Sequence, residues 1–496
     1  MDIQRVLIML GLAVTSYMLI LAWNEDYYQG STQTTEESVV VNDAYGTGDI
    51  LPTMSEPTSM GFTDIVPSLE GDDVTQAVVS VPVARNLVTV TTDVLVVKID
   101  TLGGDIVSVA LPKFPEKLET PEIPFVLVDP KNSYVAQSGL IGPSGTDKKG
   151  TRPTFTADRM SFEMGSAPEL TVTLSTVQLD GTTILKNYHF TRGDYLVDVD
   201  YQITNLGESA WKGGLFAQIK RDGQSPVSSS ENLMGMQPYV GGATRSDDEF
   251  YRKLEFDDLE EEPYKLTLDE GYIAMVQHYF VSAWVPRELS GNTYRGRKLK
   301  DQDIYIFGLT TAPVTIEPGD TGTIGASFYA GPKDQYRLEE IATGLELTVD
   351  YGFLWWLAQP LFFMLTAIHS FVGNWGLAII GLTIIVKSCL YPLSAASFRS
   401  MAKMRKLQPE MVRLKERFGD DRQQFSQAMM ELYKKEGANP LGGCLPILLQ
   451  MPVFLALYWT LMESVELRQA PFFLWIHDLS AMDPYFILPI LMGISM

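Results

Sequence analysis

One charged residue, Lys387, lies within a run of apolar residues that is long enough to enter a lipid bilayer, Leu377 to Leu393. A charge at the centre of a bilayer costs at least about 2.5 kcal/mol on the most lenient insertion scale, so such charges are usually retained for a function. A stretch rich in Lys and Arg follows directly. This pairing of a cation at membrane depth with a basic segment is the strongest chemical signal in the chain.

Three polar side chains are expected to share the surroundings of Lys387. Thr383 precedes it by four residues and Ser394 follows it by seven, so helical geometry places them on its face. The next apolar run contributes Gln450, which is flanked by two prolines. Because lipid does not tolerate a polar face, the pattern favours a water-filled cavity between helices.

The same residues also have a purely structural explanation, in which they form no cavity. Lys387 lies about 9 Å along a helix from Leu393, so its side chain could extend to the cytoplasmic headgroups. Thr383 could bond its own helix backbone, and Gln450 could join two helices.

The N-terminal part of the chain is predicted to anchor the protein. Residues 1–23 contain an apolar run after Arg5 with no small-residue cleavage site behind it, which favours a transmembrane anchor with a cytoplasmic N-terminus over a signal peptide. Residues 24–85 are rich in Ser, Thr, Gly, Pro and acidic side chains. Such a composition cannot bury enough apolar area to fold, so a flexible linker is expected.

The region 86–347 is predicted to be a large antiparallel all-β domain with a short C-terminal helix. Its segments Leu87–Ile99, Leu170–Leu174 and Tyr195–Tyr201 alternate between apolar and polar residues and are separated by turn residues. Asp334–Leu347 has the pattern of the helix.

Charge determines the expected orientation of the remaining helices. Residues 399–435 carry ten Lys and Arg against five Asp and Glu, so the positive-inside rule places them in the cytoplasm. The acidic β domain is expected on the opposite side, which allows one membrane crossing between the two. The Trp- and Phe-rich segment 348–374 is therefore predicted to be an interfacial helix and 375–394 a transmembrane helix.

Residues 395–438 are predicted to form a cytoplasmic antiparallel helical hairpin. Apolar residues there recur at spacings of three and four on both sides of a turn at Gly419, as in a coiled-coil seam. Pro409 is expected to kink or restart the first helix. Four methionines could offer an adaptable docking surface, although filling the seam is the simpler role for most of them: Met404, Met411, Met429 and Met430.

A further transmembrane helix is predicted at 441–463, followed by a loop at 464–484 and the start of another helix at 485–496. Only two cysteines occur, Cys389 and Cys444, and no metal-binding spacing, P-loop or nucleophile elbow is present in the sequence. No cofactor and no enzymatic activity are expected. The acidic balance of the β domain argues against nucleic-acid binding.

Several motifs in the C-terminal third resemble the YidC/Oxa/Alb family of membrane insertases. In chain order they are Phe371–Gly376, Tyr391–Leu393, Ser400–Arg405, Asn439–Cys444, Gln450–Pro452 and Glu466–Phe472. Upstream, the anchor, the acidic linker and Met275–Phe280 support the resemblance. It implies a multi-pass α-helical membrane protein with a periplasmic β-supersandwich, and a groove that opens to the cytoplasm and to lipid. It also implies further helices beyond Met496, so we expect the chain to be a fragment.

The resemblance assigns roles to the polar residues. Lys387 occupies the position of the single groove cation, which is usually arginine in Gram-negative members; lysine keeps the charge but lacks the planar fork. Thr383 and Gln450 match groove-lining positions, whereas Ser394 is assigned from helical phase alone.

The function implied is insertion and folding of bacterial inner-membrane proteins. Expected partners are nascent inner-membrane proteins, the Sec translocon, the ribosome and signal recognition particle pathway, and membrane lipids, with no direct nucleic-acid specificity. One alternative is a transporter that uses Lys387, which would predict an internal repeat of broken helices. Another is a membrane-anchored carbohydrate-binding or mutarotase-like protein, which would predict turnover by residues 86–345 that depends on His189 or His278.

Overall fold

A computed structural model describes residues 86–148, 151–224, 238–288, 290–299, 302–418, 422–436 and 445–495. The predicted anchor 1–23 and linker 24–85 lie outside these residues, as does the predicted turn at Gly419. Residues 481–495 belong to a different compact unit from residues 86–480, and each unit is described by itself.

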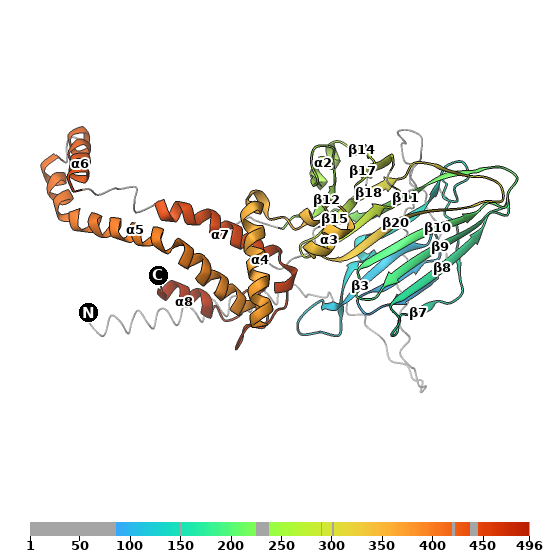
Figure 1. Ribbon diagram of the computed structural model, residues 1–496, viewed down its shortest axis with the longest axis horizontal. Helices are drawn as coiled ribbons and strands as arrows, with labels where there is room; N and C mark the ends of the chain where they lie inside the picture. The colour runs from blue at the N-terminus through green and yellow to red at the C-terminus, as the bar shows by residue number, and fades with distance from the viewer. Residues whose placement is uncertain are drawn as a thin grey trace, which may run out of the picture. The chain divides into compact units, whose positions relative to one another are not determined.

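The β domain consists of two sheets (Figure 1). The first runs in the order β14-β17-β18-β11-β5-β3-β2-β1-β7, with β4 beside β3 and β19 beside β11. Its strands are β1 (Leu87–Thr91), β2 (Val96–Asp100), β3 (Asp105–Pro115), β4 (Pro124–Val128), β5 (Val135–Ile141), β7 (Ser161–Glu163), β11 (Trp211–Asp222), β14 (Tyr264–Leu268), β17 (Asn292–Lys298), β18 (Ile304–Thr310) and β19 (Val314–Ile316). The pairing is antiparallel as predicted, except between β1 and β7, which are parallel.

The second sheet runs in the order β13-β12-β15-β16-β20-β10-β9-β8-β6. Its strands are β6 (Thr156–Ala157), β8 (Glu169–Val177), β9 (Thr183–Thr191), β10 (Leu196–Thr204), β12 (Gly241–Thr244), β13 (Arg252–Leu254), β15 (Ile273–Val276), β16 (Phe280–Pro286) and β20 (Thr321–Pro332). The short helix α2 (Phe256–Glu261) follows β13.

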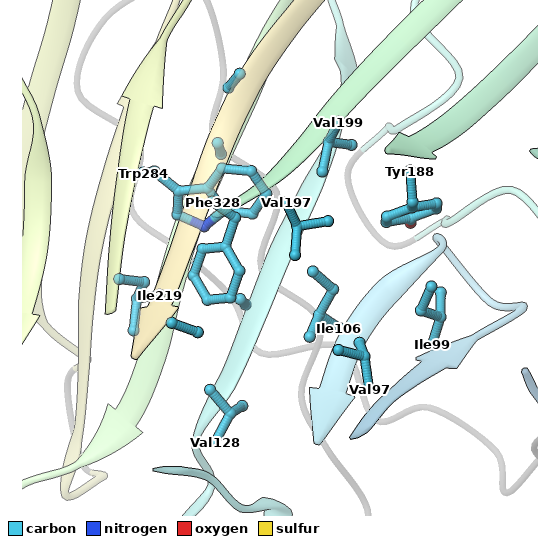
Figure 2. Close-up of a cluster of buried hydrophobic side chains, with 14 of the residues drawn as sticks. Val97, Ile99, Ile106, Val128, Tyr188, Val197, Val199, Ile219, Trp284 and Phe328 are labelled. Carbon is cyan, nitrogen blue, oxygen red and sulfur yellow. The ribbon is translucent and has the colours of Figure 1, made fainter. Parts of the chain in front are cut away.

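Side chains from both sheets fill the space between them. Figure 2 shows Val97 and Ile106 from the first sheet and Trp284 and Phe328 from the second within one apolar cluster, in which the last two rings lie 4.7 Å apart. Alternate residues of β10 are buried here, as the period-two pattern predicts. The predicted all-β sandwich is therefore confirmed.

The predicted helix after the sandwich is also present. Helix α3 (Gln335–Ile341) begins at Asp334, whose carboxylate accepts hydrogen bonds from the backbone N–H groups of Tyr336 and Arg337. The 3₁₀ helices η2 (Leu345–Thr348) and η3 (Gly352–Leu354) lead from it to the apolar helices.

Three apolar helices pack on one another through small and aliphatic side chains, which include Ala358, Leu365, Ala378, Leu382 and Ala456. These helices are α4 (Trp355–Val372), α5 (Trp375–Phe418) and α7 (Leu445–Glu463). By length and composition, Gly352–Val372 and α5 qualify as membrane spans among the described residues. Helix α4 ends at Gly373, which has a positive φ of 68°, and Asn374 accepts a hydrogen bond from the backbone of Leu377 at the start of α5.

Helix α5 runs without interruption over Pro392 and Pro409. Of the two outcomes expected at Pro409, the restart is therefore wrong, whereas the kink stays a prediction. The predicted transmembrane segment and the first half of the predicted hairpin form one helix. A proline removes one backbone hydrogen bond, but Leu407 and Met411 on either side of it are buried or half-buried. Packing on both sides of the proline therefore sustains the helix.

Helix α6 (Arg422–Glu436) lies beside the C-terminal half of α5 (Figure 1). In the other unit, helix α8 (Ile487–Ser495) follows Asp483, whose carboxylate accepts hydrogen bonds from the backbone of Tyr485 and Leu488.

Candidate substrate-binding site on the membrane helices

Lys387 projects from α5 toward a neighbouring helix. Its ammonium nitrogen lies 5.2 Å from the centroid of the Phe454 ring on α7. An ammonium at this distance is attracted by the negative face of the ring. The attraction is worth roughly 0.5–1 kcal/mol at an exposed site and about 2 kcal/mol where water is excluded. The structure thus brings the cation-bearing face of α5 against α7.

Among the described residues, no acidic side chain pairs with Lys387. Between Asp350 and Glu410 the sequence has no acidic residue, and the only one on α7 is its last residue, Glu463, which pairs with Lys333. Lys387 forms no ion pair within the part of the chain that the structure describes.

The other predicted residues surround this contact without bonding to it. The Thr383 hydroxyl donates a hydrogen bond to the backbone oxygen of Ile379 at 2.8 Å, so its proton is used within the helix. Gln450 is half-buried on α7 and Ser394 is half-buried on α5. Over the described ranges, no hydrogen bond joins these three side chains to Lys387.

Phe454 is the site residue that sequence reasoning missed. It lies four residues after Gln450, so the two side chains share one face of α7. This spacing was the only available signal, because an aromatic residue in an apolar run is otherwise indistinguishable from one that faces lipid.

The methionines of the predicted docking surface fall into two groups. Met404, Met411 and Met429 are half-buried, whereas Met430 is 60% exposed. Tyr433 of α6 donates its hydroxyl proton toward the sulfur atoms of Met411 and Met429, at 3.4 and 3.6 Å. The spacing of three and four thus marks the contact between the two helices.

The two histidines of the β domain have separate structural partners. His189 contacts Thr171 through Nδ1 at 3.0 Å and Asp200 through Nε2 at 3.1 Å. His278 Nε2 bonds the backbone oxygen of Met462 at 2.8 Å, and burial lowers the pKa of His278 to about 4. Among the described residues, no group of His, Cys, Asp and Glu is arranged to hold a metal ion.

Two family models together cover nearly all the described chain. The model of the YidC periplasmic domain matches residues 87–364, and that of the 60Kd inner membrane protein matches residues 367–496. The first region contains the sandwich and the first part of α4, and the second contains the end of α4 and the helices that carry Lys387 and Phe454.

Curated relatives match over the whole chain. The membrane protein insertase YidC of Cellvibrio japonicus is 50% identical over 503 residues, which cover 100% of this chain and 88% of the relative. The proteins of the same name from Pseudomonas putida strain W619 and Stutzerimonas stutzeri are 47% and 46% identical with the same coverage. A solved galactose mutarotase-like protein from Lactobacillus casei covers 49% of this chain and 99% of its own, at 10% identity and a TM-score of 0.35, which is too weak a likeness to bear on function. The matches to both family models and to these relatives show that the chain belongs to the YidC family of membrane protein insertases.

Proposed function

We propose that this insertase acts through a hydrophilic groove in which Lys387 attracts an acidic residue of the client segment to be translocated. The client's apolar segment then moves into lipid, driven by burial of its own apolar surface. This mechanism requires no cofactor and no covalent chemistry. The observation that carries the proposal is a cation in an apolar helix, with an aromatic ring as its described partner, within a stretch of sequence (351–409) that has no acidic residue.

The energetics favour a client carboxylate over the ring. Two unit charges 4 Å apart attract by about 1 kcal/mol in water and about 4 kcal/mol at an effective dielectric constant of 20. A partly exposed cation–π contact contributes roughly 0.5–1 kcal/mol. Phe454 can therefore hold the Lys387 ammonium between clients and be displaced when a carboxylate arrives. Gln450, Thr383 and Ser394 would supply further polar contacts along the groove.

The proposed orientation follows the charges. The basic segment 395–436, with exposed Arg399, Lys403, Arg405 and Lys406, is placed in the cytoplasm, where anionic lipid headgroups attract it. We propose that α6 and the end of α5 receive client segments there, delivered with ribosomes through the signal recognition particle pathway, alone or together with the Sec translocon.

The β-sandwich is then placed in the periplasm and the N-terminus in the cytoplasm. The part of α5 that carries Lys387 spans the bilayer, and α4 lies at the membrane surface. Helix α4 runs across the direction of α5 and α7 (Figure 1), and its first turn exposes Trp355 and Trp356, which are typical of the headgroup layer.

Photocrosslinking tests the groove. A photoreactive residue is placed at Thr383, on the face of Lys387, and a matched probe at Ile385, which lies about 200° away from Lys387 around the helix. The client is a stalled single-span protein with an acidic tail. We expect crosslinks from position 383 at least fivefold above those from 385, and their loss when Lys387→Ala is added. Equal crosslinking from both positions, unchanged by Lys387→Ala, would rule out the groove role.

A further inference from the structure

The C-terminal end of α7 is joined to the β-sandwich by a buried ion pair. Lys333 directly follows β20, Glu463 is the last residue of α7, and their side chains are 1% and 2% exposed. The Lys333 ammonium also donates to the backbone oxygen of Thr348 at 3.2 Å. Two segments 130 residues apart in the chain therefore share one buried charge pair.

Neighbouring contacts strengthen the same junction. His278, in the turn between β15 and β16, bonds the carbonyl oxygen of Met462. Just beyond α7, Arg468 and Gln469 both donate to the backbone oxygen of Pro115 at the end of β3, at 2.8 and 3.1 Å. The end of α7 is thus held by both sheets of the sandwich.

Burial along α7 differs sharply between its two ends. Ala456 and Thr460 are fully buried, whereas Met451 and Phe454 are each 53% exposed. Glu463 lies nine residues after Phe454, about 14 Å along the helix. One end of α7 is therefore fixed to the sandwich while the other presents its side chains toward Lys387.

We propose that the β-sandwich positions α7 through the Lys333–Glu463 pair and thereby sets the approach of Phe454 and Gln450 to Lys387. A buried ion pair has a strict geometric requirement, since each charge needs its partner within contact distance. It fixes both the depth and the rotation of α7 relative to β20. The functional part of this inference rests on the proposed groove, whereas the mechanical coupling does not.

Amide hydrogen exchange in lipid nanodiscs tests the coupling directly. Glu463→Gln keeps the size of the side chain but leaves the Lys333 charge buried without its counter-charge. We expect exchange in α7 to rise at least tenfold, and insertion of an acidic-tailed client to fall at least threefold. Asp198→Asn, which neutralises the half-exposed partner of Arg287 within the sandwich, is the matched control and should change neither.

A second pair of variants keeps the test valid if Glu463→Gln does not fold. Lys333→Ala with Glu463→Ala removes the contact without leaving a buried charge, and should also raise α7 exchange at least tenfold. Lys333→Met with Glu463→Leu refills the space with apolar groups and should restore exchange to within threefold of the parent. Exchange in α7 that stays at the parent level in the alanine pair would overturn the coupling.

The two proposals fail in different ways. If Lys387→Ala leaves insertion intact while the Glu463 variants still raise α7 exchange, the groove proposal fails and the coupling stands. If Lys387→Ala abolishes insertion while α7 exchange is unchanged in the Glu463 variants, the coupling fails and the groove stands.

Discussion

Two lysines, Lys186 in the β-sandwich and Lys387 on the apolar helices, differ in how far the chain itself satisfies their charge. Lys186 on β9 is fully buried, and its ammonium donates to the backbone oxygens of Gly103, Gly104 and Ser138 at 3.0, 2.8 and 3.2 Å. Lys387 has the Phe454 ring as its described partner. The first cation is held by three backbone oxygens of its own chain, whereas the second has no described hydrogen bond or ion pair and is the one for which we propose an external partner.

The cation of Lys186 has a structural purpose that its position explains. Strands β3 and β5 pair in register only at Ile106 and Ala136, so the first sheet parts near this point. Lys186 crosses from the second sheet to the carbonyl groups on both sides of the gap. Arg152 forms ion pairs beside it with Asp105 and Asp147. Burial lowers the pKa of Lys186 to about 7, opposed by these two carboxylates.

Removing Lys186 should have the largest effect on stability. Lys186→Met nearly keeps the length of the side chain but removes one charged donor from each of three buried carbonyl groups. These oxygens keep their second donors, Arg152 for Gly103 and Ser138 and the Tyr188 hydroxyl for Gly104. A hydrogen bond to a charged group contributes about 1.5–3 kcal/mol before relaxation. We expect a loss of about 3 kcal/mol in the free energy of unfolding, measured by pulse proteolysis in detergent. The matched control is Lys98→Met, at an exposed position on β2, which should unfold as the parent does. A Lys186→Met protein as stable as the control would show that Lys186 does not stabilise the β-sandwich.

Protonation of His278, at the junction with α7, should lower the free energy of unfolding by less than Lys186→Met does, and in a pH-dependent way. Burial lowers its pKa from an ordinary value near 6.5 to about 4, assisted by the positive charges of Lys333 and Arg468. The unfolded chain therefore binds a proton below about pH 6.5 that the folded chain does not. The contribution of His278 to the free energy of unfolding is therefore present above that pH and is lost as the pH falls toward 4.

Lowering the pH from 7 to 5 should cost roughly 2 kcal/mol through this group. His278→Gln, whose amide can still donate to Met462, should lose that part of the pH dependence. Thermal unfolding of both proteins at the two pH values measures the difference. Identical shifts in the parent and the variant would show that the His278 proton does not contribute.

Substitution of Phe454 should give the smallest effect, on the rate of client insertion, and tests whether its ring assists Lys387. Phe454→Leu removes the ring but keeps an apolar side chain, so we expect two- to fivefold slower insertion of an acidic-tailed client into proteoliposomes. Phe454→Tyr keeps the ring and should match the parent. A client whose acidic residue is changed to Asn serves as the control and should not distinguish the variants. Equal rates for Leu and Tyr with the acidic client would exclude a role for the ring.

The parts of this structure that follow from local pattern could be predicted from sequence. Alternation in β10 and the three-four spacing around Met411 report which side chains are buried, because burial repeats with the geometry of the strand or helix. Lys387 stood out because a charge in an apolar run is costly. The family resemblance was confirmed, whereas the groove and the roles of Thr383, Gln450 and Ser394 stay proposals.

The parts that depend on distant contacts could not be predicted. Lys333 follows a strand and Glu463 ends a helix 130 residues later, so no sequence pattern relates them. Each residue alone resembles an ordinary surface charge near the end of an element. The contact of Phe454 with Lys387 depends on how α7 is rotated against α5. Continuity of α5 over Pro409 depends on packing against α6, which local propensity does not contain.

A reciprocal charge exchange tests the central claim, that the charge of Lys387 draws the client's carboxylate into the membrane. Insertion is measured by protease protection in proteoliposomes for clients carrying either Asp or Lys in the translocated tail. Lys387→Glu is expected to lower insertion of the Asp client at least tenfold and to restore it for the Lys client, while Lys387→Arg inserts the Asp client as the parent does. Equal insertion of the Asp client by the parent and by Lys387→Glu would contradict the claim.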